Sequence, residues 1–67
     1  MIHKNAIIDP KAKISSNVKI GPYSIIGPHV EIDDDVIIQS HVNITGHTII
    51  GKNNKIFPMT SIGSDPQ

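Results

Sequence analysis

Isoleucine recurs at every sixth position of this chain, from residue 2 to residue 62, without an interruption. Eleven of the fifteen isoleucines belong to this one phase. An amphipathic α-helix needs apolar residues spaced by three and four, and a period of six does not fit that pattern. The prolines and glycines between the isoleucines also disfavour a helix. The period therefore predicts a chain built from repeated short units of another kind.

Each six-residue unit reads as a short strand followed by a turn. Two residues before each isoleucine the side chain is usually small, and the residue between them is mixed in character, as in Val18-Lys19-Ile20. This in–out–in alternation is typical of a β-strand. Four of the five prolines occupy the second turn position, where their fixed φ suits a turn. The last turn position is often Asn or Asp, which tolerate a left-handed backbone.

One such unit is too short to bury its own isoleucine, so it must stack on copies of itself. A rotation of one third of a circle per unit gives a triangular coil of eighteen residues, in which residue i lies under residue i+18, about 4.8 Å away. We predict an all-β fold, a parallel β-helix of about three and a half coils that spans residues 1–67 as a single segment. The phase isoleucines, such as Ile20, Ile38 and Ile56, are expected inside the prism. The spacing alone does not determine the handedness.

Composition excludes several classes of protein. Six basic residues balance six acidic ones, which gives no reason to expect a nucleic acid or a membrane surface as a partner. Without cysteine there are no disulfides and no thiolate metal sites. The N-terminus has no apolar run of a signal peptide, and no stretch approaches the ~20 apolar residues that span a bilayer. We therefore expect a cytoplasmic protein with no membrane span.

Units of the form aliphatic-Gly-x-x-small-x resemble those of the hexapeptide acyltransferase superfamily, whose coils are left-handed. A narrower resemblance, to the UDP-N-acetylglucosamine O-acyltransferase family, rests on residues 26–32 (Ile-Gly-Pro-His-Val-Glu-Ile), Ser40-His41-Val42 and Gly46-His47-Thr48. The repeat does not require these histidines. The tail, residues 61–67, resembles the segment that enters the nucleotide-sugar site of that family.

The resemblance implies a cytoplasmic homotrimer that needs no cofactor. Such an enzyme transfers a 3-hydroxyacyl chain from acyl carrier protein to the sugar 3-hydroxyl of UDP-N-acetylglucosamine, which is the first step of lipid A biosynthesis. It also implies that Gln67 contacts the substrate; the alternative is that Gln67 belongs to a disordered terminus.

This chain departs from the family pattern in three ways. Family members are several times longer, their general-base histidine lies in a later His-x-x-His stretch, and they have a C-terminal helical domain. This sequence contains neither of the last two features. We therefore expect an N-terminal fragment of such an enzyme, or the product of a truncated gene, with no catalytic residue in this chain and no activity on its own.

The histidines are the obvious candidates for other chemistry. His29, His41 and His47 share the last turn position, and the period of eighteen stacks His29 under His47, with Asp65 next in the column, while His41 lies at another corner. Zinc needs convergent ligands, whereas corner residues splay outward. We expect no metal site, and we expect local hydrogen bonding rather than catalysis from these turn residues. The Gly-Pro pairs at 21–22 and 27–28 are not phosphate loops, because no helix follows them.

Two other functional classes remain open at this stage. One is a different hexapeptide enzyme, either the N-acyltransferase that acts later in the same pathway or a carbonic anhydrase-like protein. The other is a non-catalytic β-helix that only binds or scaffolds.

Overall fold

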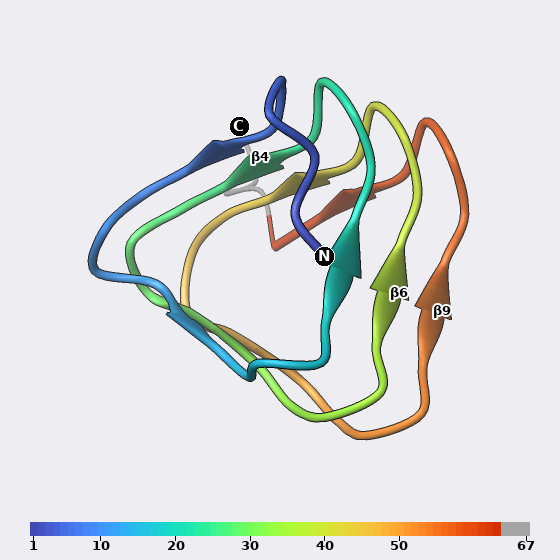
Figure 1. The fold of residues 1–67 in the computed structure, drawn as a ribbon. Coiled ribbons are helices and arrows are strands. Elements are labelled where there is room, and N and C mark those ends of the chain that lie inside the picture. Colours follow the sequence, from blue (N-terminus) through green and yellow to red (C-terminus); the bar gives the residue numbers. More distant parts are fainter. Residues whose placement is uncertain (64–67) are drawn as a thin grey trace.

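The computed structural model describes residues 1–63, which form ten short parallel strands and contain no helix. Every strand ends at one of the phase isoleucines, as the period of six predicts. The chain turns at three corners per coil, and successive coils lie side by side (Figure 1). The result is the predicted left-handed parallel β-helix.

The strands form three parallel sheets, one for each face of the prism. The first sheet contains β1 (Ile7–Ile8), β4 (Ile25–Ile26), β7 (Asn43–Ile44) and β10 (Ser61–Ile62). The second contains β2 (Lys13–Ile14), β5 (Val30–Ile32) and β8 (Thr48–Ile50). The third contains β3 (Lys19–Ile20), β6 (Ile37–Ile38) and β9 (Lys55–Ile56).

The register between strands is eighteen residues throughout the described chain. Ile8 pairs with Ile26, Ile14 with Ile32 and Ile20 with Ile38. An isolated bridge between Ile2 and Ile20 extends the third sheet by one more rung. Because strand side chains alternate, this register stacks each inward isoleucine on the isoleucine of the next coil.

The interior of the prism is aliphatic. The fully buried hydrophobic side chains are Val18, Ile20, Ile26, Val30, Ile32, Val36, Ile38, Val42, Ile44 and Ile50. They come only from the isoleucine phase and from the small phase two residues earlier, which confirms the predicted alternation. Ile56 is half-buried against this core, as are the phase isoleucines near the two ends, Ile8, Ile14 and Ile62.

The prediction that every phase isoleucine is buried is wrong for Ile2, whose side chain is 47% exposed. Ile2 pairs only with Ile20 above it, and no described residue stacks beneath it. Burial in a solenoid needs a neighbour on both sides.

Several corners have a left-handed backbone, and the residues that adopt it are not limited to Asn and Asp. Five non-glycine residues have a positive φ between 57° and 66°, and all of them occupy the last turn position: Tyr23, Asp35, His41, Asn53 and Met59. Three of these five are neither Asn nor Asp, so residue type did not predict them. Bonds between coils hold the conformation, since Tyr23 N–H donates to the Asn5 carbonyl at 3.1 Å and Met59 N–H to the Ser40 carbonyl at 3.3 Å.

Candidate functional site

The structure separates the three candidate histidines into two corners. The imidazole rings of His29 and His47 stack one coil apart, with centroids 4.5 Å apart and planes inclined by 13°. This confirms the predicted stacking. His41 lies at a different corner, where its ring centroid is 5.3 Å from that of Tyr23. The three histidines therefore do not converge on one site within a single chain.

The corner that carries the stacked pair owes its shape to local sequence. Pro28 precedes His29, and Gly46, with a φ of +71°, precedes His47. A Cβ atom at Gly46 would lie only 2.6 Å from the carbonyl oxygen of Gly63, so a larger residue does not fit there without a shift of the backbone. These turns place both histidines on the same edge of the prism, where their side chains are exposed.

A hollow of about 250 Å³ lies beside the stacked rings. Besides His29 and His47 it is lined by the side chains of Lys11, Lys13 and Glu31. Lys11 belongs to the same column as the histidines, eighteen residues below His29. Sequence analysis did not single out either lysine. The period of eighteen could have placed Lys11 in the histidine column. That Lys13, on the adjacent strand, also lines the hollow is visible only in the structure.

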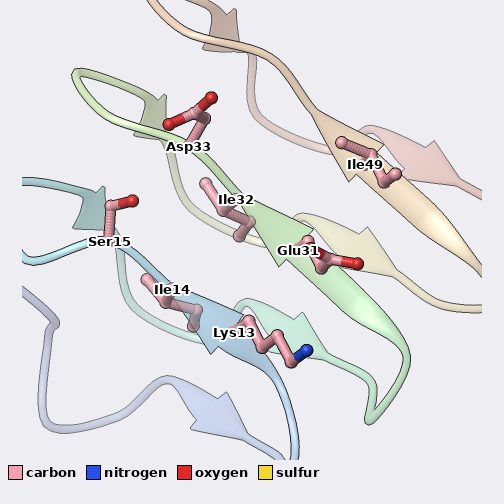
Figure 2. Close-up of a pocket in the computed structure, with 7 residues that line it drawn as sticks. All are labelled: Lys13, Ile14, Ser15, Glu31, Ile32, Asp33 and Ile49. Atoms are coloured by element: carbon pink, nitrogen blue, oxygen red, sulfur yellow. The ribbon is translucent and has the colours of Figure 1, made fainter.

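A second hollow, of about 350 Å³, lies on the same outer face and shares Lys13 and Glu31 with the first (Figure 2). Lys13 and Glu31 are register partners on β2 and β5, and Glu31 is followed by Ile49 on β8. Ser15 and Asp33 bound this hollow at the ends of their strands. One Asp33 carboxylate oxygen accepts the Asp34 N–H at 2.8 Å.

The outer face of the β2–β5–β8 sheet thus has two ends of different chemistry. Lys11 and the histidine pair lie at the end where the strands begin, and Ser15 and Asp33 lie at the end where they finish. Lysine and histidine donate hydrogen bonds to anions, whereas carboxylate and hydroxyl oxygens accept hydrogen bonds. This face has the polar groups to bind and orient a polar molecule.

Two further expectations concern a metal site and a substrate contact. Among residues 1–63, no group of three His, Asp or Glu side chains is placed to hold one metal ion. Asp65, the next member of the histidine column, and Gln67, the predicted substrate contact, both lie outside the described residues. The role of Gln67 stays a prediction. In the same part of the chain, no helix is present that could cross a membrane.

Two solved structures are similar to this chain over nearly its whole length. One is described as the crystal structure of UDP-N-acetylglucosamine acyltransferase; it is 45% identical, with a TM-score of 0.97, and the match covers 100% of this chain and 26% of that chain. The other is UDP-N-acetylglucosamine acyltransferase from Francisella novicida, 45% identical with a TM-score of 0.95, covering 98% of this chain and 24% of that one. This chain therefore spans about a quarter of the length of either solved chain.

No curated protein matches the sequence. The family model described as bacterial transferase hexapeptide (six repeats) matches residues 1–33 and, in a second overlapping match, residues 11–46. These matches cover more than half of the chain and include the strands from β1 to β7, each of which ends at a phase isoleucine. The chain belongs to the bacterial transferase hexapeptide family.

Proposed function

We propose that this chain forms the first coils of an enzyme that transfers a 3-hydroxyacyl group from acyl carrier protein to the 3-hydroxyl of UDP-N-acetylglucosamine. The observation that carries the proposal is the 45% identity, at a TM-score of 0.97, to a UDP-N-acetylglucosamine acyltransferase across the whole chain. The second solved acyltransferase of the same name supports it at the same identity.

In this proposal the described coils are a scaffold and contribute no catalytic residue. Acyl transfer needs a general base within hydrogen-bond reach of the sugar hydroxyl and a donor for the developing oxyanion. His29, His41 and His47 are exposed corner residues at two separate edges of the prism. The family resemblance assigns the base to a His-x-x-His stretch in later coils, and assigns Gln67 to the substrate site.

The cellular setting and the assembly belong to the same proposal. We infer that the reaction opens lipid A biosynthesis in the cytoplasm, and that the full-length enzyme is a homotrimer. The outward-facing pair Ile7 and Ile25 supports a contact between subunits, because these side chains are register partners and are 64% and 43% exposed. Contiguous exposed apolar side chains mark interaction surfaces more often than isolated ones do.

A graft tests the proposed function directly. Residues 1–67 would replace the matching quarter of the similar UDP-N-acetylglucosamine acyltransferase, and the product would be followed with charged acyl carrier protein and the nucleotide sugar. We expect the graft to form 3-O-acylated product, because its coils continue into the catalytic coils in the same register. A graft that folds to the parental size but makes no product would contradict the proposal.

The same graft with Ile38→Lys is the matched control, since a buried charge at that core position should abolish folding and product together. A second test is the DNA that follows codon 67. We expect it to encode a His-x-x-His stretch, in frame or after one frameshift, and its absence would favour a non-catalytic β-helix.

A further inference from the structure

We propose that the column of Lys11, His29 and His47, together with Lys13, is a binding site for a phosphate group. This site lies in the described coils and is separate from the acyl-transfer function proposed above. The proposal rests on one observation: lysine and histidine side chains from three successive coils gather at one edge of the β2–β5–β8 face.

The first supporting observation is convergence. Lys11, His29 and His47 come from the same corner of three coils, and the lysine of β2 adds a fourth nitrogen-bearing side chain to the same hollow of about 250 Å³. The 4.5 Å stacking of the two imidazoles aligns their rings along the edge. Lysine and histidine can each direct N–H donors at phosphate oxygens, and such charge-assisted hydrogen bonds are stronger than neutral ones.

The second observation is the balance of charge around the hollow. Among residues 1–63, Glu31 is the only carboxylate that lines the hollow, and Asp9 lies in the same corner as Lys11, where its Oδ1 accepts the Lys11 N–H at 2.9 Å. A phosphate group is anionic, so the two lysines attract it, and imidazole N–H groups can donate hydrogen bonds to its oxygens.

The test is a titration of the 67-residue chain followed by the imidazole C–H resonances in NMR. Inorganic phosphate, UDP and uridine would be added separately at one fixed pH, with ionic strength held constant by chloride. We expect saturable shifts at His29 and His47 with phosphate and with UDP, and none with uridine. His41 is the internal control, because it lies at another corner against Tyr23.

The two phosphate-bearing probes distinguish the source of the group. Saturation by UDP at a concentration at least tenfold lower than that of phosphate indicates a nucleotide diphosphate, whereas similar affinities indicate a free phosphate ion. The double variant K11Q/K13Q should weaken binding roughly fivefold, since each exposed lysine adds a modest attraction to the anion. The matched control is K19Q/K55Q, which removes two lysines from the β3–β6–β9 face and should leave the affinity unchanged.

The proposal is overturned if His29 and His47 shift no more than His41, or if the two double variants weaken binding equally. If the 67-residue chain is unfolded alone, the phosphate titration is made on the graft described above and on the same graft carrying H29Q/H47Q. Loss of a saturable phosphate response in that variant supports the site, and an unchanged response refutes it. The graft can lose its acyltransferase activity and still bind phosphate, so the two proposals fail separately.

Discussion

The hydroxyl of Ser24 donates a hydrogen bond of 2.7 Å to the carbonyl oxygen of Gln39, which lies at the corner of the next coil. The hydroxyl oxygen of Ser24 also accepts the N–H of Val42 at 3.1 Å. Ser24 is the only fully buried polar side chain among residues 1–63, and no buried side-chain nitrogen or oxygen in that range lacks a partner. The single hydroxyl of Ser24 thus makes hydrogen bonds to two backbone groups of the next coil and links the two coils inside the prism.

The variant Ser24→Ala should destabilise the chain by about 1–3 kcal/mol, because it leaves the buried Val42 N–H and the partly buried Gln39 carbonyl without their partner. Urea or thermal unfolding followed by circular dichroism measures the loss. The control is Ser16→Ala at an exposed turn position, where the change should stay within about 0.5 kcal/mol. Equal effects of the two variants would show that the Ser24 bonds contribute nothing to stability.

The variant Ile38→Ala tests the stacked core. Ile38 is 1% exposed and lies between Ile20 and Ile56 in its column, so truncation leaves a cavity and should cost about 2–5 kcal/mol. Ile49→Ala removes the same atoms from a side chain that is 75% exposed and should change stability by less than about 0.5 kcal/mol. A comparable loss in both would contradict the division into inward and outward phases.

The variant Gly46→Ala tests the corner that carries His47. The left-handed φ of +71° costs a residue with a Cβ about 1–2 kcal/mol, and the close approach to the Gly63 carbonyl adds to that cost. Gly51→Ala is the matched control, since Gly51 is not left-handed and a Cβ atom added there would lie 3.7 Å from the nearest atom, Asn54 Nδ2. Thermal unfolding should rank Gly46→Ala as the less stable variant, and the reverse order would refute this interpretation of the turn.

The double variant Ile7→Lys/Ile25→Lys tests the proposed subunit contact in the full-length enzyme. Two charges on one apolar patch oppose its burial, so we expect the trimer to dissociate, as measured by size-exclusion chromatography with light scattering. The control is Ile49→Lys on a different face of the prism. An unchanged trimer in the double variant would argue against an interface at the β1–β4 face.

The 67-residue chain alone should have no acyltransferase activity, because His29, His41 and His47 are exposed at two separate corners and the family resemblance places the general base in later coils. The assay supplies acyl carrier protein charged with a 3-hydroxyacyl group and UDP-N-acetylglucosamine, and measures acylated product. Product above background that disappears on changing His41 or His47 would show that the active site lies in these coils after all.

The period of six determined most of the fold in advance, because each short strand has to end where its isoleucine turns inward. It predicted the ends of all ten strands and the stacking of His29 under His47. It did not predict the left-handed backbone at Tyr23 and Met59, since that conformation depends on bonds to the neighbouring coil rather than on residue type. The handedness was likewise available only from family resemblance.

The candidate site was less predictable than the fold. Sequence analysis found the histidine column, but the approach of Lys13 depends on how a strand side chain leans toward the corner beside it. Spacing along the chain places residues on a face and does not give the direction of long side chains. The exposure of Ile2 was missed for a related reason: the repeat treats all coils as equal, whereas no described residue stacks beneath Ile2.

The constant register of eighteen residues limits how the length of such a chain can change. An insertion of six residues between His29 and His47 would move His47 to the corner now occupied by Asn17, Asp35 and Asn53, and the two imidazoles would no longer meet. An insertion of eighteen residues outside that interval would return every downstream residue to its own face and would only lengthen the prism. A surface site made by stacked side chains of successive coils is therefore preserved when whole coils are inserted outside the stacked pair. It is lost when a single six-residue repeat is inserted between the stacked residues.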